Sequence, residues 1–259
     1  WAVMEELNIS DVDLLKGLYA NATVRLKPGG GQSKDDAEGS TVTFDTGVAQ
    51  GSALSPLLFL IFMNTLLRLL TAKGRELGIS HGLEGVDQFN NMAFADDLSL
   101  FAQSTGDMQV LLDEVQKFEA WSGLKVNRDK TCALIAGVKS DTTQQRTGLS
   151  YNGSAIRILG CDEACRYLGL WSTANGDMSE MKERVRKKTQ EAIDLMKHHP
   201  LTPRMAIELF TSIGVGAFRY SAALVPWTWA ELQDLGKMWI QGYKLAWKQP
   251  FSAASEFFI

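Results

Sequence analysis

Hydrophobic and polar residues follow two different periods along the chain, and the period of two predicts strands. Residues 22–27 and 40–46 alternate in this way and predict two strands joined by a long, polar, glycine-rich hairpin loop. Residues 83–102 predict a strand, a tight turn at Ala95-Asp96-Asp97 and a second strand. Shorter strand-like runs follow at residues 131–135, 156–159 and 166–171.

Helical spacing of apolar residues marks other segments of the first two thirds of the chain. Residues 4–21 predict the end of one helix and then a second helix, with Ser10 as its N-cap. A longer helix is predicted from Ser55-Pro56 to about Leu77, because proline is favoured at the first helical position. Another helix is capped by Ser104 or Thr105 and ends at Gly123.

After Asn175 the pattern becomes purely helical. The predicted helices begin near Met178, at Thr202-Pro203 and after Pro226-Trp227-Thr228. The predicted organisation is therefore a mixed α+β body over residues 1–174 and a helical region over residues 175–259.

Composition places the chain among globular proteins. Of its 259 residues, 45% are hydrophobic and 22% are charged, a balance that excludes an intrinsically disordered chain. Its cysteines, Cys132, Cys161 and Cys165, are too few for a disulfide framework, so reduced thiols and an intracellular location are expected. The net charge of −4 argues mildly against a nucleic-acid binder, although a local basic stripe would still serve.

The longest uncharged stretch, residues 46–67, requires comparison with a membrane-spanning helix. Only residues 57–63 are continuously apolar, and polar side chains interrupt the remainder. Because a spanning helix needs about 20 predominantly apolar residues, we predict a buried core helix and no membrane partner.

Two adjacent carboxylates, Asp96 and Asp97, stand between apolar runs. Bringing carboxylates together is unfavourable unless a cation is present. A tight turn would expose both at the end of two strands, where hard oxygen ligands suit Mg²⁺. An ordinary acidic turn is the alternative, because aspartate is common in turns.

A second candidate site precedes the long helix and runs from Gly47 to Phe59, with Gln50-Gly51 near its start. Glycines before a helix let the backbone approach a ligand closely, and helix N-termini attract phosphate. A strand-to-helix turn capped by Ser55, without any ligand, would explain the same residues.

These two segments together resemble motifs of reverse transcriptases, most closely those of non-LTR (LINE-type) retrotransposons. Further motifs fall in the order typical of that family: Gly123-Leu124-Lys125-Val126-Asn127 with Lys130-Thr131, and then Tyr167-Leu168-Gly169, which is similar to the primer grip. The resemblance covers nearly the whole chain. It implies an α+β fold in which residues 1–174 form a partial palm with a remnant of the fingers, and residues 175–259 form a helical thumb.

The resemblance implies an RNA-directed DNA polymerase, a nucleotidyltransferase that uses dNTPs and two Mg²⁺ ions to extend a DNA primer along an RNA template. Asp96 would then be a metal ligand and Asp97 a weaker ligand, with Phe94 beside them. Gln50 and Gly51 would line the nucleotide pocket. Lys130 would act as a general acid toward the leaving pyrophosphate, or be an ordinary surface lysine.

Two other segments would contact the primer and template. Tyr167, Leu168 and Gly169 would form the primer grip. A basic cluster on the predicted thumb helix would touch the duplex backbone without reading its sequence, and it comprises Lys182, Arg184, Arg186, Lys187 and Lys188. A solvated helix face is the alternative interpretation of this cluster.

The family also requires an aspartate on a strand upstream of the Gln50-Gly51 turn, and no residue here matches it. Asp11 and Asp13 fall at a predicted helix start, and Asp45 is too close to Gly47. We therefore expect this aspartate before Trp1, in a longer polyprotein. Elements of this family commonly carry an endonuclease in the same polyprotein. Residues 1–259 alone would then bind metal poorly and polymerise little. The location would be the nucleus or the cytoplasm.

Weaker signals favour structural roles. Trp227, Trp229, Trp239 and Trp247 have helical spacing, which is more typical of core residues than of base-stacking residues. His198-His199 before Pro200 indicates a helix end. Cys161 and Cys165 lack a matching ligand pair, so zinc is not expected.

Three classes of function remain in view. The first is the polymerase. The second is a non-catalytic remnant of a reverse transcriptase that binds RNA or an RNA/DNA hybrid. The third is an unrelated interaction protein, which would require all the motifs to coincide by chance.

Overall fold

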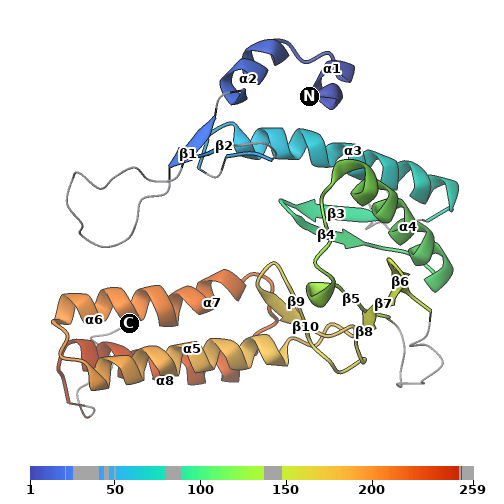
Figure 1. The fold of residues 1–259 in the computed structure, drawn as a ribbon. Coiled ribbons are helices and arrows are strands. Elements are labelled where there is room, and N and C mark those ends of the chain that lie inside the picture. The colour runs from blue at the N-terminus through green and yellow to red at the C-terminus, as the bar shows by residue number, and fades with distance from the viewer. Residues whose placement is uncertain are drawn as a thin grey trace. The chain divides into compact units, whose positions relative to one another are not determined.

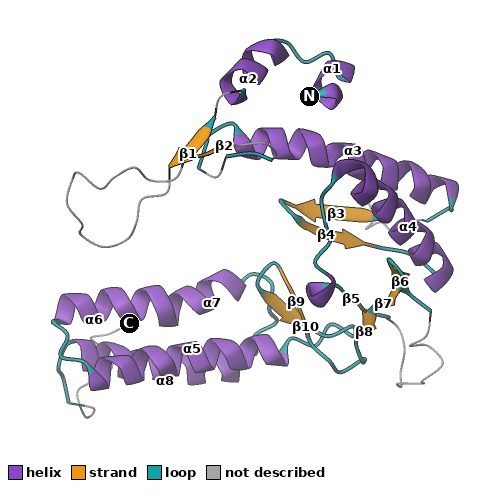
Figure 2. Ribbon diagram, in the orientation of Figure 1, coloured by secondary structure: helices purple, strands orange, loops and turns teal. Residues whose placement is uncertain are grey.

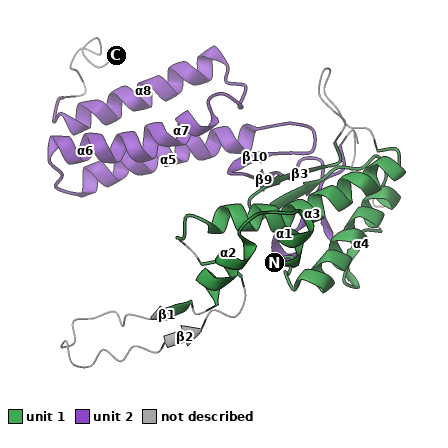
Figure 3. Ribbon diagram, turned by 90° about the horizontal axis from the view of Figure 1, so that it is seen from above, with its two compact units in different colours: residues 1–126, 148–155 green, residues 127–147, 156–259 purple. Residues whose placement is uncertain are grey.

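The computed structural model describes residues 1–20, 22–25, 41–43, 47–49, 51–79, 89–136, 148–250 and 252 (Figure 1). The chain forms two compact units, coloured separately in Figure 3. The first unit comprises residues 1–126 and 148–155, and the second comprises residues 127–147 and 156–259. The predicted functional boundary at residue 174 stays a prediction.

The first unit opens with two short helices, α1 (Ala2–Glu6) and α2 (Val12–Tyr19). The N-cap of α2 is Asp11, so the prediction of Ser10 was wrong. The chain turns at Asp11 with a φ of 62°, a left-handed conformation that aspartate tolerates better than most residues. Strands β1 (Thr23–Arg25) and β2 (Thr41–Thr43) then pair antiparallel, as predicted, while most of the predicted loop between them lies outside the described residues.

Two long helices, α3 (Ser55–Glu76) and α4 (Thr105–Ser122), pack against each other through aromatic rings. Phe62 of α3 lies 5.6 Å from Phe118 and 5.8 Å from Trp121, measured between ring centroids. The predicted ends of α4 are confirmed, since the Ser104 hydroxyl accepts the Asp107 backbone N–H at 3.1 Å and Gly123 ends the helix.

A hairpin of β3 (Asn91–Phe94) and β4 (Asp97–Leu100) is fastened to α3 by amide side chains. The buried Asn90 donates from Nδ2 to the Leu70 carbonyl at 2.7 Å, and Asn91 Nδ2 lies 3.1 Å from Thr71 Oγ1. These bonds fix the hairpin on the second half of α3.

A second hairpin, β6 (Ser150–Tyr151) with β7 (Ser154–Ala155), was not predicted. It is held by α4: the Tyr151 hydroxyl donates to Glu119 at 2.6 Å, and the Ser150 backbone N–H donates to Gln109 Oε1 at 2.8 Å.

The second unit begins with a 3₁₀ turn, Arg128–Lys130, and small strand pairs (Figure 2). Strand β5 (Cys132–Ala133) runs parallel to β8 (Arg157–Ile158). The predicted strand over residues 166–171 is instead a hairpin of β9 (Cys165–Tyr167) and β10 (Leu170–Ser172), because the chain reverses at Leu168-Gly169.

Helices complete the described part of this unit. Helices α5 (Ser179–His198), α6 (Pro203–Phe210) and α8 (Trp229–Ala246) begin where the three helices were predicted, whereas α7 (Gly216–Ser221) was not predicted as a separate helix. A π-helical turn, Thr211–Val215, joins α6 to α7. Ala192, Ile193 and Phe210 form one fully buried cluster, and Met181, Val185, Val225 and Leu235 form another.

The core interpretation of the tryptophans holds for only half of them. Trp227 and Trp239 pack against the second of these clusters. Trp229 and Trp247 are 74% and 54% exposed, so the prediction that they belong to the core was wrong.

Judged by length and composition alone, helix α3 is long and apolar enough to cross a membrane. No other helix among the described residues passes this test. One such helix is weak evidence for a membrane protein, because a core helix passes the same test. Here α3 packs on α4, β3 and α1 within the first unit, but only 28% of its most apolar stretch is buried, so the prediction of a buried core helix is not confirmed.

Candidate active site

The β3–β4 turn presents the acidic pair that the sequence singled out. Phe94 lies directly opposite Asp97 in the ladder, so Ala95 and Asp96 are the two turn residues and Asp97 is the first residue of β4. Ala95 has a φ of 52°, as expected in a hairpin turn of this length. Asp96, Asp97 and Phe94 are all exposed, and Phe94 is 66% exposed.

The two carboxylates fit a hard cation. Among the described residues, no lysine, arginine or histidine lies within ion-pair distance of Asp96 or Asp97. Adjacent carboxylates without a protein cation repel each other, and Mg²⁺, which binds through one or two carboxylates and keeps several waters, would relieve this repulsion. No cluster of three or more His, Cys, Asp or Glu side chains suited to a metal occurs within the described part of the chain.

The turn before α3 is built from backbone and hydroxyl bonds. Gly51 has a φ of 87°, and the Ser52 backbone N–H donates to the Ala49 carbonyl at 3.2 Å. The buried Ser55 hydroxyl donates to the same carbonyl at 2.6 Å, while the N-cap of α3 is Leu54. Ser55 therefore closes the turn instead of capping the helix. Gln50 lies outside the described residues.

The acidic turn and the glycine turn lie toward the same end of α3. In Figure 1, β3 runs in the opposite direction to α3. Asn90, just before β3, is bonded to Leu70, and Asn91, its first residue, is bonded to Thr71. The Ala95-Asp96 turn therefore points back toward the start of the helix, which follows Gly51.

Lys130 belongs to the second unit and ends a 3₁₀ turn. The Asn127 side chain accepts the Lys130 backbone N–H at 3.3 Å, and the Thr131 hydroxyl donates to the Asn127 carbonyl at 2.8 Å. The backbone at Lys130 is thus fixed locally, and its side chain is exposed.

The predicted primer-grip residues form the turn of the β9–β10 hairpin. Tyr167 is 38% exposed, and Leu168 and Gly169 both have positive φ values, of 47° and 85°. The Tyr220 hydroxyl of α7 donates to the Leu168 carbonyl. Tyr220 belongs to no recognised sequence motif, so the sequence did not predict its contact with Leu168.

Much of the predicted basic cluster is engaged within the second unit. Lys182, whose side chain is only 14% exposed, lies 2.9 Å from Glu231, and Arg186 lies 3.6 Å from the same carboxylate. Arg184 pairs with Glu180 and lies 3.9 Å from the ring centroid of Trp171. Lys188 pairs with Glu191 at 2.8 Å. Lys187 is exposed, without a carboxylate within ion-pair distance among the described residues.

Other candidates have local roles. His198 is the last residue of α5, as predicted, and its Nδ1 lies 2.7 Å from the Asp194 carbonyl. Cys165 Sγ lies 3.4 Å from Cys132 Sγ, and burial together with this contact raises the pKa of Cys165 to about 11.

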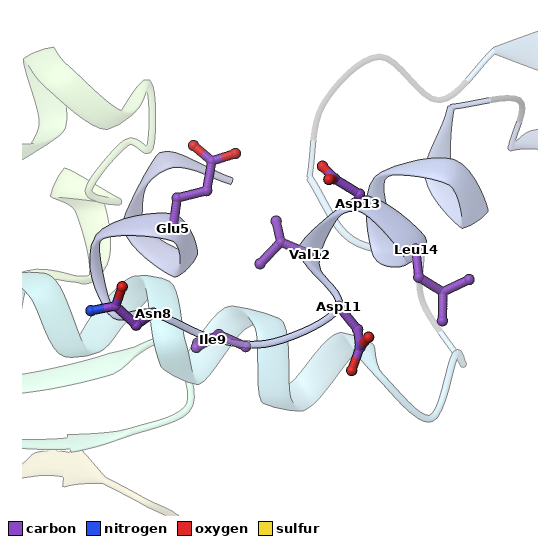
Figure 4. Close-up of a pocket in the computed structure, with 7 residues that line it drawn as sticks. All are labelled: Glu5, Asn8, Ile9, Asp11, Val12, Asp13 and Leu14. Atoms are coloured by element: carbon purple, nitrogen blue, oxygen red, sulfur yellow. The ribbon is translucent and has the colours of Figure 1, made fainter.

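An open hollow of about 610 Å³ lies along α1, α2 and the link between them (Figure 4). Asp11 and Asp13 point away from each other there, and Glu5 is paired with Lys16. The hollow therefore does not bring its carboxylates together. Its lining residues are Glu5, Asn8, Ile9, Asp11, Val12, Asp13 and Leu14.

Comparison with known families accounts for this arrangement of motifs. Residues 3–171 match the model of the family described as reverse transcriptase (RNA-dependent DNA polymerase), so the chain belongs to that family. The match includes the glycine turn, the acidic hairpin and nearly all of the β9–β10 hairpin. Helices α5–α8 lie beyond it.

Two retrotransposon proteins are similar to the chain. Over 155 residues it is 39% identical to the Retrovirus-related Pol polyprotein from type-2 retrotransposable element R2DM of Drosophila melanogaster, covering 57% of this chain and 14% of that protein. Over 169 residues it is 30% identical to the Retrovirus-related Pol polyprotein from type-1 retrotransposable element R2 of Nasonia vitripennis. This alignment covers 62% of this chain and 15% of that protein. The predicted relation to non-LTR reverse transcriptases is confirmed, and the chain spans about a seventh of the length of these relatives.

Proposed function

We propose that this chain supplies metal-binding, nucleotide-contacting and primer-contacting residues to an RNA-directed DNA polymerase of a retroelement. The observation that carries the proposal is the exposed Asp96-Asp97 pair on a hairpin fastened to α3. It lies within the residues that match the reverse transcriptase family. The substrates would be dNTPs, an RNA template and a DNA primer.

Asp96 would hold the catalytic Mg²⁺, with Asp97 as a weaker ligand. When bound, the metal would lower the pKa of the primer 3′-hydroxyl and stabilise charge on the triphosphate. Phe94, Gln50 and Gly51 would orient the incoming nucleotide. The Lys130 ammonium would hold a proton near the departing pyrophosphate.

In this proposal residues 1–174 form a partial palm with part of the fingers, and residues 175–259 form the thumb. Tyr167, Leu168 and Gly169 would hold the primer end. The basic cluster of α5 would contact the duplex backbone, chiefly through the exposed Lys187. The metal site would be completed by an aspartate upstream of Trp1 in a longer polyprotein, which would act in the nucleus or the cytoplasm.

Primer extension on an RNA template, with dNTPs and Mg²⁺, tests this proposal. The first comparison is between residues 1–259 and a protein extended upstream of Trp1. The second is between the longer protein and its Asp96→Ala, Asp97→Ala and Asp162→Ala variants. We expect extension by the longer protein and a loss of about a thousandfold for Asp96→Ala, since a catalytic metal supplies several kcal/mol. Asp97→Ala should lose less, and Asp162→Ala, at an exposed loop acid, should change nothing.

The other outcomes are equally informative. Full activity in Asp96→Ala would contradict the metal-binding role of the hairpin. Extension by residues 1–259 alone would mean that no upstream aspartate is needed. Binding of an RNA/DNA hybrid without extension by either protein would favour the non-catalytic remnant.

A further inference from the structure

The turn of the β9–β10 hairpin has an unfavourable backbone conformation. Tyr167 is opposite Leu170 in the ladder, so Leu168 and Gly169 are the two central turn residues. Both have positive φ values, the combination that a type I′ turn requires. Glycine adopts this conformation readily, but leucine does not. Contacts from outside the turn are therefore needed to hold Leu168 in place.

Tyr220 of α7 makes those contacts. Its hydroxyl donates to the Leu168 carbonyl, which fixes the residue with the unfavourable φ. Its ring lies against Gly169, where an added Cβ would come within 3.2 Å of Cε1. One side chain from a distant helix thus contacts both turn residues.

The body of the same hairpin is held by α5 and the helical core. The Arg184 guanidinium lies 3.9 Å from the Trp171 ring centroid, and its Nε pairs with Glu180 at 2.7 Å. Leu170 and Trp171 also pack against the cluster of Met181, Val185, Val225 and Leu235. With the body fixed in this way, Tyr220 is left to determine the conformation of the turn.

We propose that Tyr220 is a positioning residue for the primer end, acting through the Leu168-Gly169 turn. This inference rests on the proposed function, in which that turn holds the primer. Loss of the Tyr220 hydroxyl frees the turn to leave its type I′ conformation. The primer end then spends less time aligned for reaction, while overall duplex affinity, which phosphate contacts dominate, is unchanged.

Tyr220→Phe is the test, because it removes the hydroxyl and keeps the ring. The matched control is Tyr243→Phe in α8: its ring packs against Phe210, and its hydroxyl has no hydrogen bond among the described residues. Hydrogen exchange on residues 1–259 should show the amides of 168–170 exchanging about fivefold faster in Tyr220→Phe, the effect of one lost hydrogen bond. The control should match the unsubstituted protein.

Kinetics on the longer protein test the link to the primer. Single-turnover extension, normalised to the active fraction, should be about fivefold slower in Tyr220→Phe, with the Kd for primer–template within about twofold. A variant that is merely less stable would lower the active fraction and leave this normalised rate unchanged.

The two readouts separate the possible failures. Unchanged exchange at residues 168–170 would overturn the role of Tyr220 in holding the turn. Faster exchange with an unchanged extension rate would overturn its role toward the primer. A longer protein that never extends a primer would refute the proposed function and the primer role together, while the exchange result would still decide whether Tyr220 holds the turn.

Discussion

Cys165 shows how a neighbouring side chain and burial change the chemistry of a thiol. The sulfurs of Cys165 and Cys132 are 3.4 Å apart although these residues belong to β9 and β5, strands of different sheets. Burial and the contact with Cys132 raise the pKa of Cys165 from its ordinary value of 9.0 to about 11. The neutral thiol is therefore favoured in the folded state, and the associated stability is complete below pH 9 and lost as the pH rises through 11.

Alkylation of Cys165 by iodoacetamide should consequently be slow at pH 8. The thiolate is the reacting species, and a pKa raised by about two units reduces its population at pH 8 about a hundredfold relative to an ordinary thiol. The rate, followed by peptide mass spectrometry from pH 7 to 11, should rise until about pH 11. Cys132→Ser should move this profile to lower pH. A rate that levels off near pH 9 would contradict the raised pKa.

At the scale of the element, the crossing of α6 and α8 depends on Gly242. The Phe210 ring is fully buried, and a Cβ on Gly242 would come within 2.4 Å of Phe210 Cε2. Gly242→Ala should destabilise the protein by about 1–3 kcal/mol, because the ring cannot move without disturbing the core. Guanidinium unfolding followed by circular dichroism measures the effect.

Gly236→Ala is the control, since it lies on the same helix and a Cβ there meets nothing within 4 Å. It should stabilise the protein by about 0.5–1 kcal/mol, as expected for alanine in an open helical position. Equal effects of the two substitutions would show that helix propensity, and not the Phe210 contact, determines stability here.

The start of α8 contains a capping box that is also bonded to α5. Thr228 and Glu231 bond each other's backbone N–H groups, and Lys182 donates to Glu231 at 2.9 Å. The hydrogen bond from Lys182 and those from Thr228 lower the pKa of Glu231 to about 2. The ionised carboxylate thus stabilises the folded state above its ordinary pKa, and this stabilisation is lost as the pH falls from about 4.5 toward 2.

Glu231→Gln should therefore lower the melting temperature at pH 7, and the difference from the unsubstituted protein should shrink progressively below pH 4.5. Glu208→Gln, which removes only an exposed ion pair with Arg204, should change little at any pH. A difference that is independent of pH would mean that the charge of Glu231 is unimportant.

These elements also show which features a sequence can predict. Both ends of α4 follow from local rules, because Ser104 and Gly123 act within one turn of the helix. The reversal at Leu168 and the β6–β7 hairpin depend on side chains far along the chain, Tyr220 in one case and Gln109 and Glu119 in the other. At the candidate site, the order of motifs predicted the acidic turn, but Asn90, which docks the hairpin on α3, belongs to no motif.

At the scale of the whole molecule, the family match and the compact units divide the chain differently. The match ends at Trp171, whereas the second unit joins the β9–β10 hairpin to helices α5–α8. Arg184 and Tyr220 make this connection from beyond the matched residues. A hairpin that lies almost wholly within the family match is therefore positioned by helices that lie outside it.

The net charge of the whole chain means that any affinity for nucleic acid would have to come from a local surface. With a net charge of −4, any affinity for a duplex must come from a basic surface, and in the cluster of residues 182–188 the exposed Lys187 is the cation best placed to supply it. Lys187→Ala should weaken binding of an RNA/DNA hybrid and reduce the slope of log K against log salt by about one, the effect of one lost phosphate contact. Fluorescence anisotropy at several salt concentrations measures both quantities.

Two further lysines make this prediction specific. Lys182→Ala should lower stability through loss of the Glu231 bond, but leave the salt slope of the folded protein nearly unchanged, because its ammonium is already paired. Lys237→Ala, at an exposed lysine of α8 paired with Asp234, should change neither the affinity for the hybrid nor the salt slope. An unchanged slope for Lys187→Ala would assign this face of α5 to solvent, and equal losses in all three variants would show that binding responds only to net charge.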